Sequence, residues 1–224
     1  MRNILLGILL MTALLGAKAQ TEPEYRLEVG GGIGAVSYLG DFNQSLFQNM
    51  QPMFSAVAKY RMSPRTAWAL NVGYGQLKGE QKNAKTYYPE MTDYRFSSTL
   101  VDVGLRYEYN FWPYGTGQEY RGAKRLTPFI YIGVGATIAK PSDTHVGVNM
   151  PLGGGVKYKI ANRMNLAVEW TMHFTNCDKL DGMQDPYGIK SSGLFKNTDC
   201  YSQLRVTVTY DLWAKCKTCH NDRD

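Results

Sequence analysis

Apolar and polar residues alternate with a period of two along most of this chain. In residues 99–112, TLVDVGLRYEYNFW, every second residue from Val101 to Phe111 is apolar or aromatic, and the residues between them are polar, charged or glycine. A period of two indicates a β-strand with one apolar and one polar face. The alternation recurs in eight segments, which are 25–38, 52–62, 67–77, 99–112, 126–139, 148–160, 165–175 and 200–213.

The lengths of these segments and of their connections predict how the strands assemble. The segments are about 11 to 14 residues long, whereas strands of soluble proteins average about 5–6 residues. A tilted strand needs about 9–11 residues to cross a bilayer. Connections 62–66 and 161–164 are short, 113–125 is intermediate, and 40–51, 78–96, 140–147 and 176–199 are mostly longer and polar. We therefore predict an all-β fold, an eight-stranded antiparallel transmembrane β-barrel of the outer-membrane type.

Two features predict that the apolar face points outward to lipid. Glycines such as Gly30, Gly73 and Gly104 fall on the polar face, where small residues suit the narrow lumen of an eight-stranded barrel. Five aromatic residues fall near one rim, as expected for the girdle at a lipid–water boundary: Tyr60, Trp68, Trp112, Tyr158 and Trp213.

The polar face then places nearly balanced charges inside the barrel. The acids are Glu28, Asp102, Glu108, Glu169 and Asp211, and the bases are Lys59, Arg61, Arg106, Lys157, Lys159 and Arg205. Because unpaired buried charge is costly, we expect these groups to satisfy one another in a self-plugged interior without transport.

The N-terminus predicts export. Arg2, an apolar run over residues 4–15 and Ala17-Lys18-Ala19 form a secretory signal peptide, which we assign to residues 1–19. The barrel is expected over residues 20–213 and a periplasmic C-terminal tail over 214–224, with both termini in the periplasm and the long loops at the cell surface. Loss of Arg2 and Lys18 lowers the formal charge from +6 to +4, and the bases are scattered, so nucleic-acid binding is not expected.

Two segments resemble a known family. Residues 28–43, EVGGGIGAVSYLGDFN, and 204–213, LRVTVTYDLW, are similar to PorG, the small outer-membrane barrel of the type IX secretion system in the Bacteroidetes. The most specific element is Tyr38-Leu39-Gly40-Asp41. The resemblance implies a non-enzymatic component that contacts the periplasmic ring made by the lipoprotein PorK and its partner PorN. It brings no catalytic residues, and we expect no cofactor and no small-molecule substrate.

Cys177 and Cys200 bracket the last external loop. Adjacent strand ends can meet the distance that a disulfide requires, and the exported context permits oxidation, so we predict that these two residues pair.

The tail carries Cys216-Lys217-Thr218-Cys219-His220, which has the spacing of a c-type haem attachment site. The tail offers no apolar pocket for haem, and a zinc site would need two further ligands. A local Cys216–Cys219 disulfide remains open. Our hypothesis is that the tail residues Cys216, Lys217, Cys219 and His220 contact a periplasmic partner, with an intermolecular disulfide as its covalent form.

The second candidate contact surface is the largest periplasmic turn, PYGTGQEYRGAKR, residues 113–125. Its candidate contact residues are Tyr114, Tyr120, Arg121, Lys124 and Arg125.

Two other functions remain open. A passive OmpA-like surface barrel could bind a ligand or host through loops such as 78–96, which is rich in tyrosine and charge. A small lipid-modifying enzyme would need a base such as His173 with a nucleophile in reach. Thr171 and Thr175 share its face, but we read no persuasive catalytic set.

Overall fold

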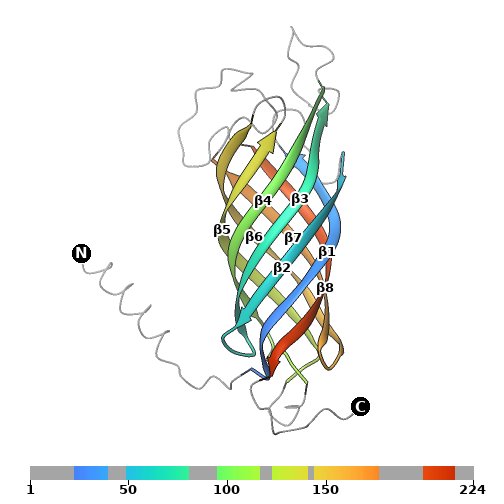
Figure 1. The fold of residues 1–224 in the computed structure, drawn as a ribbon, viewed down its shortest axis with the longest axis vertical. Helices are drawn as coiled ribbons and strands as arrows, with labels where there is room; N and C mark the ends of the chain where they lie inside the picture. The colour runs from blue at the N-terminus through green and yellow to red at the C-terminus, as the bar shows by residue number, and fades with distance from the viewer. Residues whose placement is uncertain are drawn as a thin grey trace, which may run out of the picture.

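The computed structural model describes residues 23–39, 49–80, 95–116, 123–140, 144–176 and 199–214, which form a closed antiparallel barrel. Each strand pairs with the next, and the last pairs with the first (Figure 1). The strands are β1 (Tyr25–Leu39), β2 (Gln51–Arg61), β3 (Thr66–Glu80), β4 (Arg95–Asn110), β5 (Leu126–Lys140), β6 (His145–Ala161), β7 (Met164–Thr175) and β8 (Cys200–Ala214). The predicted fold class is confirmed. No helix within these described ranges is long and apolar enough to cross a bilayer.

The barrel has two different ends. β1 begins and β8 ends at the lower end in Figure 1, where the connections β2–β3 and β6–β7 also lie. We call this the turn end, and the opposite end the loop end.

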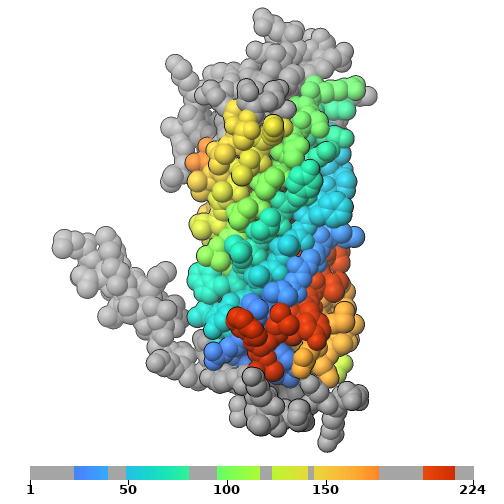
Figure 2. Space-filling model, in the orientation of Figure 1, coloured from blue at the N-terminus to red at the C-terminus, as the bar shows by residue number. Residues whose placement is uncertain are grey.

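The side chains alternate between the wall and the lumen as predicted. Outward-facing apolar residues are exposed, for example Ile33 at 65 % and Val134 at 64 %, whereas lumen-facing residues such as Glu108 and Asp211 are fully buried. Figure 2 shows that side chains of neighbouring strands cover the wall in diagonal bands. All five aromatic residues of the predicted girdle are exposed on this wall: Tyr60, Trp68, Trp112, Tyr158 and Trp213. The apolar surface is on the outside.

Several strands are longer than predicted at the loop end. β3 runs to Glu80 and β4 starts at Arg95, so the predicted loop 78–96 is partly strand, and β6 starts at His145 inside the predicted loop 140–147. The pairing Lys78↔Ser97 continues the β3–β4 ladder with polar side chains on the outer face. The ladder depends on backbone hydrogen bonds, which persist where the outward residues change from apolar to polar.

β1 and β8 meet with an irregularity at the turn end. Tyr25 pairs with Ala214 and Leu27 with Leu212, while Trp213 has a positive φ of 57°. This kink leaves Trp213 exposed and Tyr25 buried. Above it, a Cβ at Gly30 would lie 2.1 Å from the carbonyl oxygen of Val208, so only glycine allows this close approach of the two strands.

Candidate functional site

The turn-end half of the lumen is an ion-pair network. Lys159 Nζ and Arg61 both contact the Asp211 carboxylate, and Arg61 also pairs with Glu28. Asn165 Nδ2 donates a hydrogen bond of 2.9 Å to Asp211 Oδ1. All of these side chains are at most 8 % exposed. They satisfy one another, as the sequence predicts for a self-plugged interior.

The network continues through Glu108 of β4. Its carboxylate lies 2.6 Å from Lys157 Nζ, 3.1 Å from Arg106 Nε and 3.4 Å from Lys59 Nζ. Lys157 Nζ also lies 4.2 Å from the centre of the Phe129 ring, a cation–π distance. One fully buried carboxylate therefore holds three cations.

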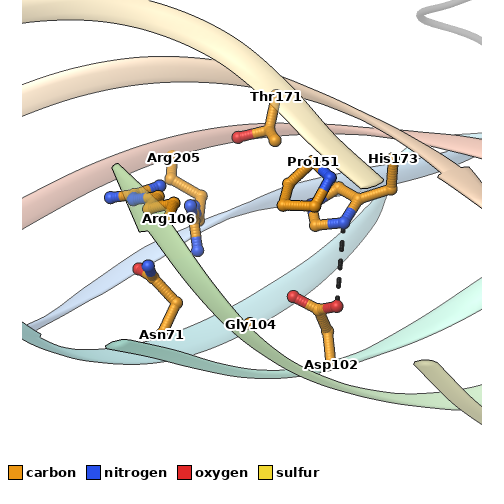
Figure 3. Close-up of a pocket in the computed structure, with 8 residues that line it drawn as sticks. All are labelled: Asn71, Asp102, Gly104, Arg106, Pro151, Thr171, His173 and Arg205. Atoms are coloured by element: carbon orange, nitrogen blue, oxygen red, sulfur yellow. Dashed lines mark ion pairs between the residues drawn. The ribbon is translucent and has the colours of Figure 1, made fainter. Parts of the chain in front are cut away.

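A small cavity lies next to this network (Figure 3). Arg106 Nη2 and Arg205 Nη2 lie 2.9 and 3.0 Å from the Glu169 carboxylate. Arg106 and Arg205 lie on one side of the cavity and Asp102 and His173 on the other (Figure 3). The full lining is Asn71, Asp102, Gly104, Arg106, Pro151, Thr171, His173 and Arg205.

His173 contacts Asp102 and Tyr201 in the lumen. Its Nδ1 lies 3.7 Å from Asp102 Oδ1, and its ring stacks on Tyr201 with centroids 4.3 Å apart. The Thr171 hydroxyl hydrogen-bonds the Tyr131 hydroxyl, and Thr175 donates to the Asp199 carbonyl. That the chain is not an enzyme stays a prediction.

Asp102 is surrounded by neutral donors that sequence reasoning did not identify. Asn149 Nδ2 and the Tyr201 hydroxyl donate to its Oδ1 at 2.8 and 2.9 Å. Both donors occupy lumen-facing positions of their strands, and this phase is the signal that could have found them. No cluster of three or more His, Cys, Asp or Glu suited to a metal occurs in the described part of the chain.

The loop-end half of the lumen contains an apolar cluster beside buried polar groups, which the sequence interpretation missed. Tyr38 and Phe96 meet edge to face with centroids 4.9 Å apart. They belong to a buried cluster formed by Val36, Tyr38, Met53, Leu77, Phe96, Leu100, Ala139 and Tyr201. The lumen face of the strands thus carries several apolar side chains at this end, and they pack together inside the barrel.

Tyr114 fills the lumen at the turn end. Its side chain is 5 % exposed, and its hydroxyl donates a hydrogen bond of 2.9 Å to Asn165 Oδ1. The Arg61 guanidinium lies 5.3 Å from the centre of its ring, and burial raises the Tyr114 pKa well above its ordinary value. This burial corrects the prediction that Tyr114 contacts a partner, because the ring lies inside the barrel rather than on its surface.

Other residues of this segment face solvent. Lys124 and Arg125 are exposed, and Lys124 Nζ lies 4.4 Å from the centre of the Trp112 ring. Arg65 in the β2–β3 turn is also exposed, and its Nη1 donates to the Phe111 carbonyl at 3.0 Å. The turn end therefore presents a basic cluster, Arg65, Lys124 and Arg125, beside exposed aromatic rings.

The remaining predicted site residues lie outside the described ranges. These are Tyr120, Arg121, Cys177, Cys216, Lys217, Cys219 and His220, together with the predicted signal peptide and most of the tail. Cys200 is half-buried as the first residue of β8. Its pairing with Cys177 stays a prediction.

Known structures with similar folds include bacterial outer-membrane barrels. Neisserial surface protein A is 12 % identical, with a TM-score of 0.51, over 83 % of this chain and 97 % of that one. Ail of Yersinia pestis, in complex with the heparin analogue sucrose octasulfate, is 8 % identical, with a TM-score of 0.51, over 85 % of this chain and 100 % of that one. OprG of Pseudomonas aeruginosa is 11 % identical, with a TM-score of 0.51, over 87 % of this chain and 99 % of that one. At these identities the likeness concerns the fold.

The sequence itself relates the chain to one family. No curated protein matches it significantly. Residues 2–221 match a family described as a domain of unknown function, DUF6089. The match spans nearly the whole of the chain, which therefore belongs to the DUF6089 family.

Proposed function

We propose that this small barrel anchors a periplasmic protein ring of the type IX secretion machinery to the outer membrane. The apolar wall would seat the barrel in the bilayer, with its termini in the periplasm and its long loops at the cell surface. The turn end would then meet the ring, whose proteins are of the PorK/PorN type. We propose this partner because residues 28–43 and 204–213 resemble PorG.

The observation that carries the proposal is that both ends of the lumen are filled. Tyr114 occupies the turn end, and the apolar cluster around Tyr38 and Phe96 occupies the loop end. The ion pairs between them are nearly inaccessible to solvent. A lumen packed in this way favours a function on the outer surfaces over conduction through the barrel.

The turn end offers charge suited to a protein partner. Arg65, Lys124 and Arg125 are exposed close to the plug residue Tyr114. Backbone bonds from Tyr114 N to the Pro64 carbonyl and from Lys124 N to the Pro113 carbonyl fix the segment in place. A fixed basic surface would hold an acidic partner surface without the entropy cost of ordering a loop.

Co-purification from mild detergent tests the proposal. The tagged full chain is compared with the turn-end variant Arg65→Gln/Lys124→Gln/Arg125→Gln, and bound proteins are identified. The matched control removes three bases from the loop end: Lys78→Gln/Arg95→Gln/Lys140→Gln. We expect ring proteins with the wild type and the control, and loss with the turn-end variant or after removal of residues 215–224. A barrel that purifies alone would contradict the anchor.

A second candidate is a surface barrel whose external loops bind a ligand or host. Lys78, Arg95 and Lys140 are exposed at the loop end and favour an anionic ligand there. This candidate predicts that the loop-end variant loses binding of the ligand or host while the turn-end variant keeps it, whereas the anchor predicts that only the turn-end variant loses its partner.

For the covalent form of the anchor, Cys216→Ser/Cys219→Ser should remove a high-mass band on non-reducing gels.

A further inference from the structure

Three side chains around the lumen cavity carry hydrogen-bond donors that have no acceptor among the described residues. They are Asn71 Nδ2, Arg106 Nη1, and Arg205 Nε and Nη1. The three residues are at most 5 % exposed, and all of them line the cavity (Figure 3). Because a buried donor without an acceptor costs free energy, these groups call for an acceptor in the cavity.

The charges around the cavity also favour a hydrogen-bond acceptor there. The connected ion pairs join six cations to four carboxylates, namely Lys59, Arg61, Arg106, Lys157, Lys159 and Arg205 with Glu28, Glu108, Glu169 and Asp211. Asp102 lies across the cavity and accepts bonds from neutral Asn149 and Tyr201. At the cavity itself, the guanidinium groups of Arg106 and Arg205 share the Glu169 carboxylate.

The space for an occupant exists because residue 104 is glycine. Gly104 lines the cavity, and a Cβ built there would lie 3.6 Å from the Val134 carbonyl oxygen and 3.8 Å from Gly135 Cα, which are ordinary contacts. An alanine would fit where other lumen glycines, such as Gly30, would clash with backbone. The cavity holds about one small ion or water molecule.

We propose that this cavity binds one monovalent anion of halide size between Arg106, Arg205 and Asn71. A halide only accepts hydrogen bonds, so it matches the free donors on the arginine side of the cavity, whereas the acceptors that a water molecule would also need, Asp102 and His173, lie on the other side. The anion also adds a negative charge beside two guanidinium groups that share one carboxylate, Glu169. It ties β3, β4 and β8 together across the lumen, and the site does not depend on the proposed ring anchor.

Halide-dependent stability tests the site. The full chain, in detergent, is heated in chloride or in gluconate, a bulkier anion, at equal ionic strength, and the loss of the folded form is followed by gel mobility. We expect a wild-type midpoint higher in chloride by roughly 5 °C or more, if chloride is well above its Kd. Gly104→Ala, which fills the cavity without changing a charge, should show no chloride effect. The matched control Gly115→Ala, placed where a Cβ meets nothing within 4 Å, should behave as wild type.

A second variant replaces the anion by a side chain. Asn71→Asp places a carboxylate beside the two arginines, so it should be as stable in gluconate as in chloride. Crystals grown in bromide should give an anomalous peak in the cavity of the wild type. Equal wild-type midpoints in both anions, the same chloride effect in Gly104→Ala, or cavity density without anomalous signal, meaning water only, would overturn the proposal.

Discussion

Glu108→Gln is the single substitution that should most disturb the lumen. Glu108 is fully buried and its carboxylate contacts Lys59, Arg106 and Lys157 at 2.6–3.4 Å. The amide keeps the shape of the side chain but removes the charge that holds three cations. Breaking a buried ion pair by removing one partner costs about 3–5 kcal/mol, so we expect a loss of stability in this range.

Equilibrium unfolding in denaturant, with the barrel in detergent or lipid, measures this loss. The four tryptophans lie at exposed positions of the barrel wall and report its disassembly. The control Glu80→Gln removes a half-buried carboxylate at the loop end and should cost at most about 1 kcal/mol. The double variant Glu108→Gln/Lys157→Met should lose less free energy of unfolding than the two single variants lose together. A cost below about 1 kcal/mol for Glu108→Gln would refute the assignment of this residue as the centre of the network.

Three further predictions use the same unfolding assay or gel mobility. Val72→Arg puts a charge on the apolar wall and should cost about 2–4 kcal/mol in lipid; a neutral effect there would contradict a lipid-facing wall. Tyr114→Phe removes the hydrogen bond to Asn165 but keeps the plug, so it should cost about 0.5–1.5 kcal/mol; no change would show that the bond does not form. Gly30→Ala should abolish the heat-modifiable folded form because its Cβ would lie on the Val208 carbonyl oxygen, and normal folding would show that β1 and β8 lie further apart.

The phase of each strand was predictable from the sequence because an outward and an inward position differ sharply in polarity. Val103 and Asp102 are neighbours in the chain, and one is 40 % exposed while the other is buried. The ends of strands were harder to predict. Lys78 continues the β3 ladder with a polar outward side chain, whereas the loss of apolar alternation there predicts a loop.

Contacts inside the barrel cannot be predicted from the two-residue period of the strands. Periodicity assigns Tyr38 and Phe96 to a face, but it does not show that lumen-facing residues of distant strands gather into an apolar plug at one end. Tyr114 lies in a short irregular segment with no period at all. Its burial depends on the tertiary position of Asn165 and Arg61, which the local sequence does not encode.

The most direct test of the central claim is the behaviour of the processed chain in water without detergent. An outer wall carrying Ile33, Val134, Val148 and many similar exposed side chains predicts that the folded barrel floats with lipid vesicles in a density gradient and aggregates when detergent is removed. A compact monomer that remains in solution and does not bind vesicles would contradict a lipid-facing wall, and with it the proposed anchor in the outer membrane.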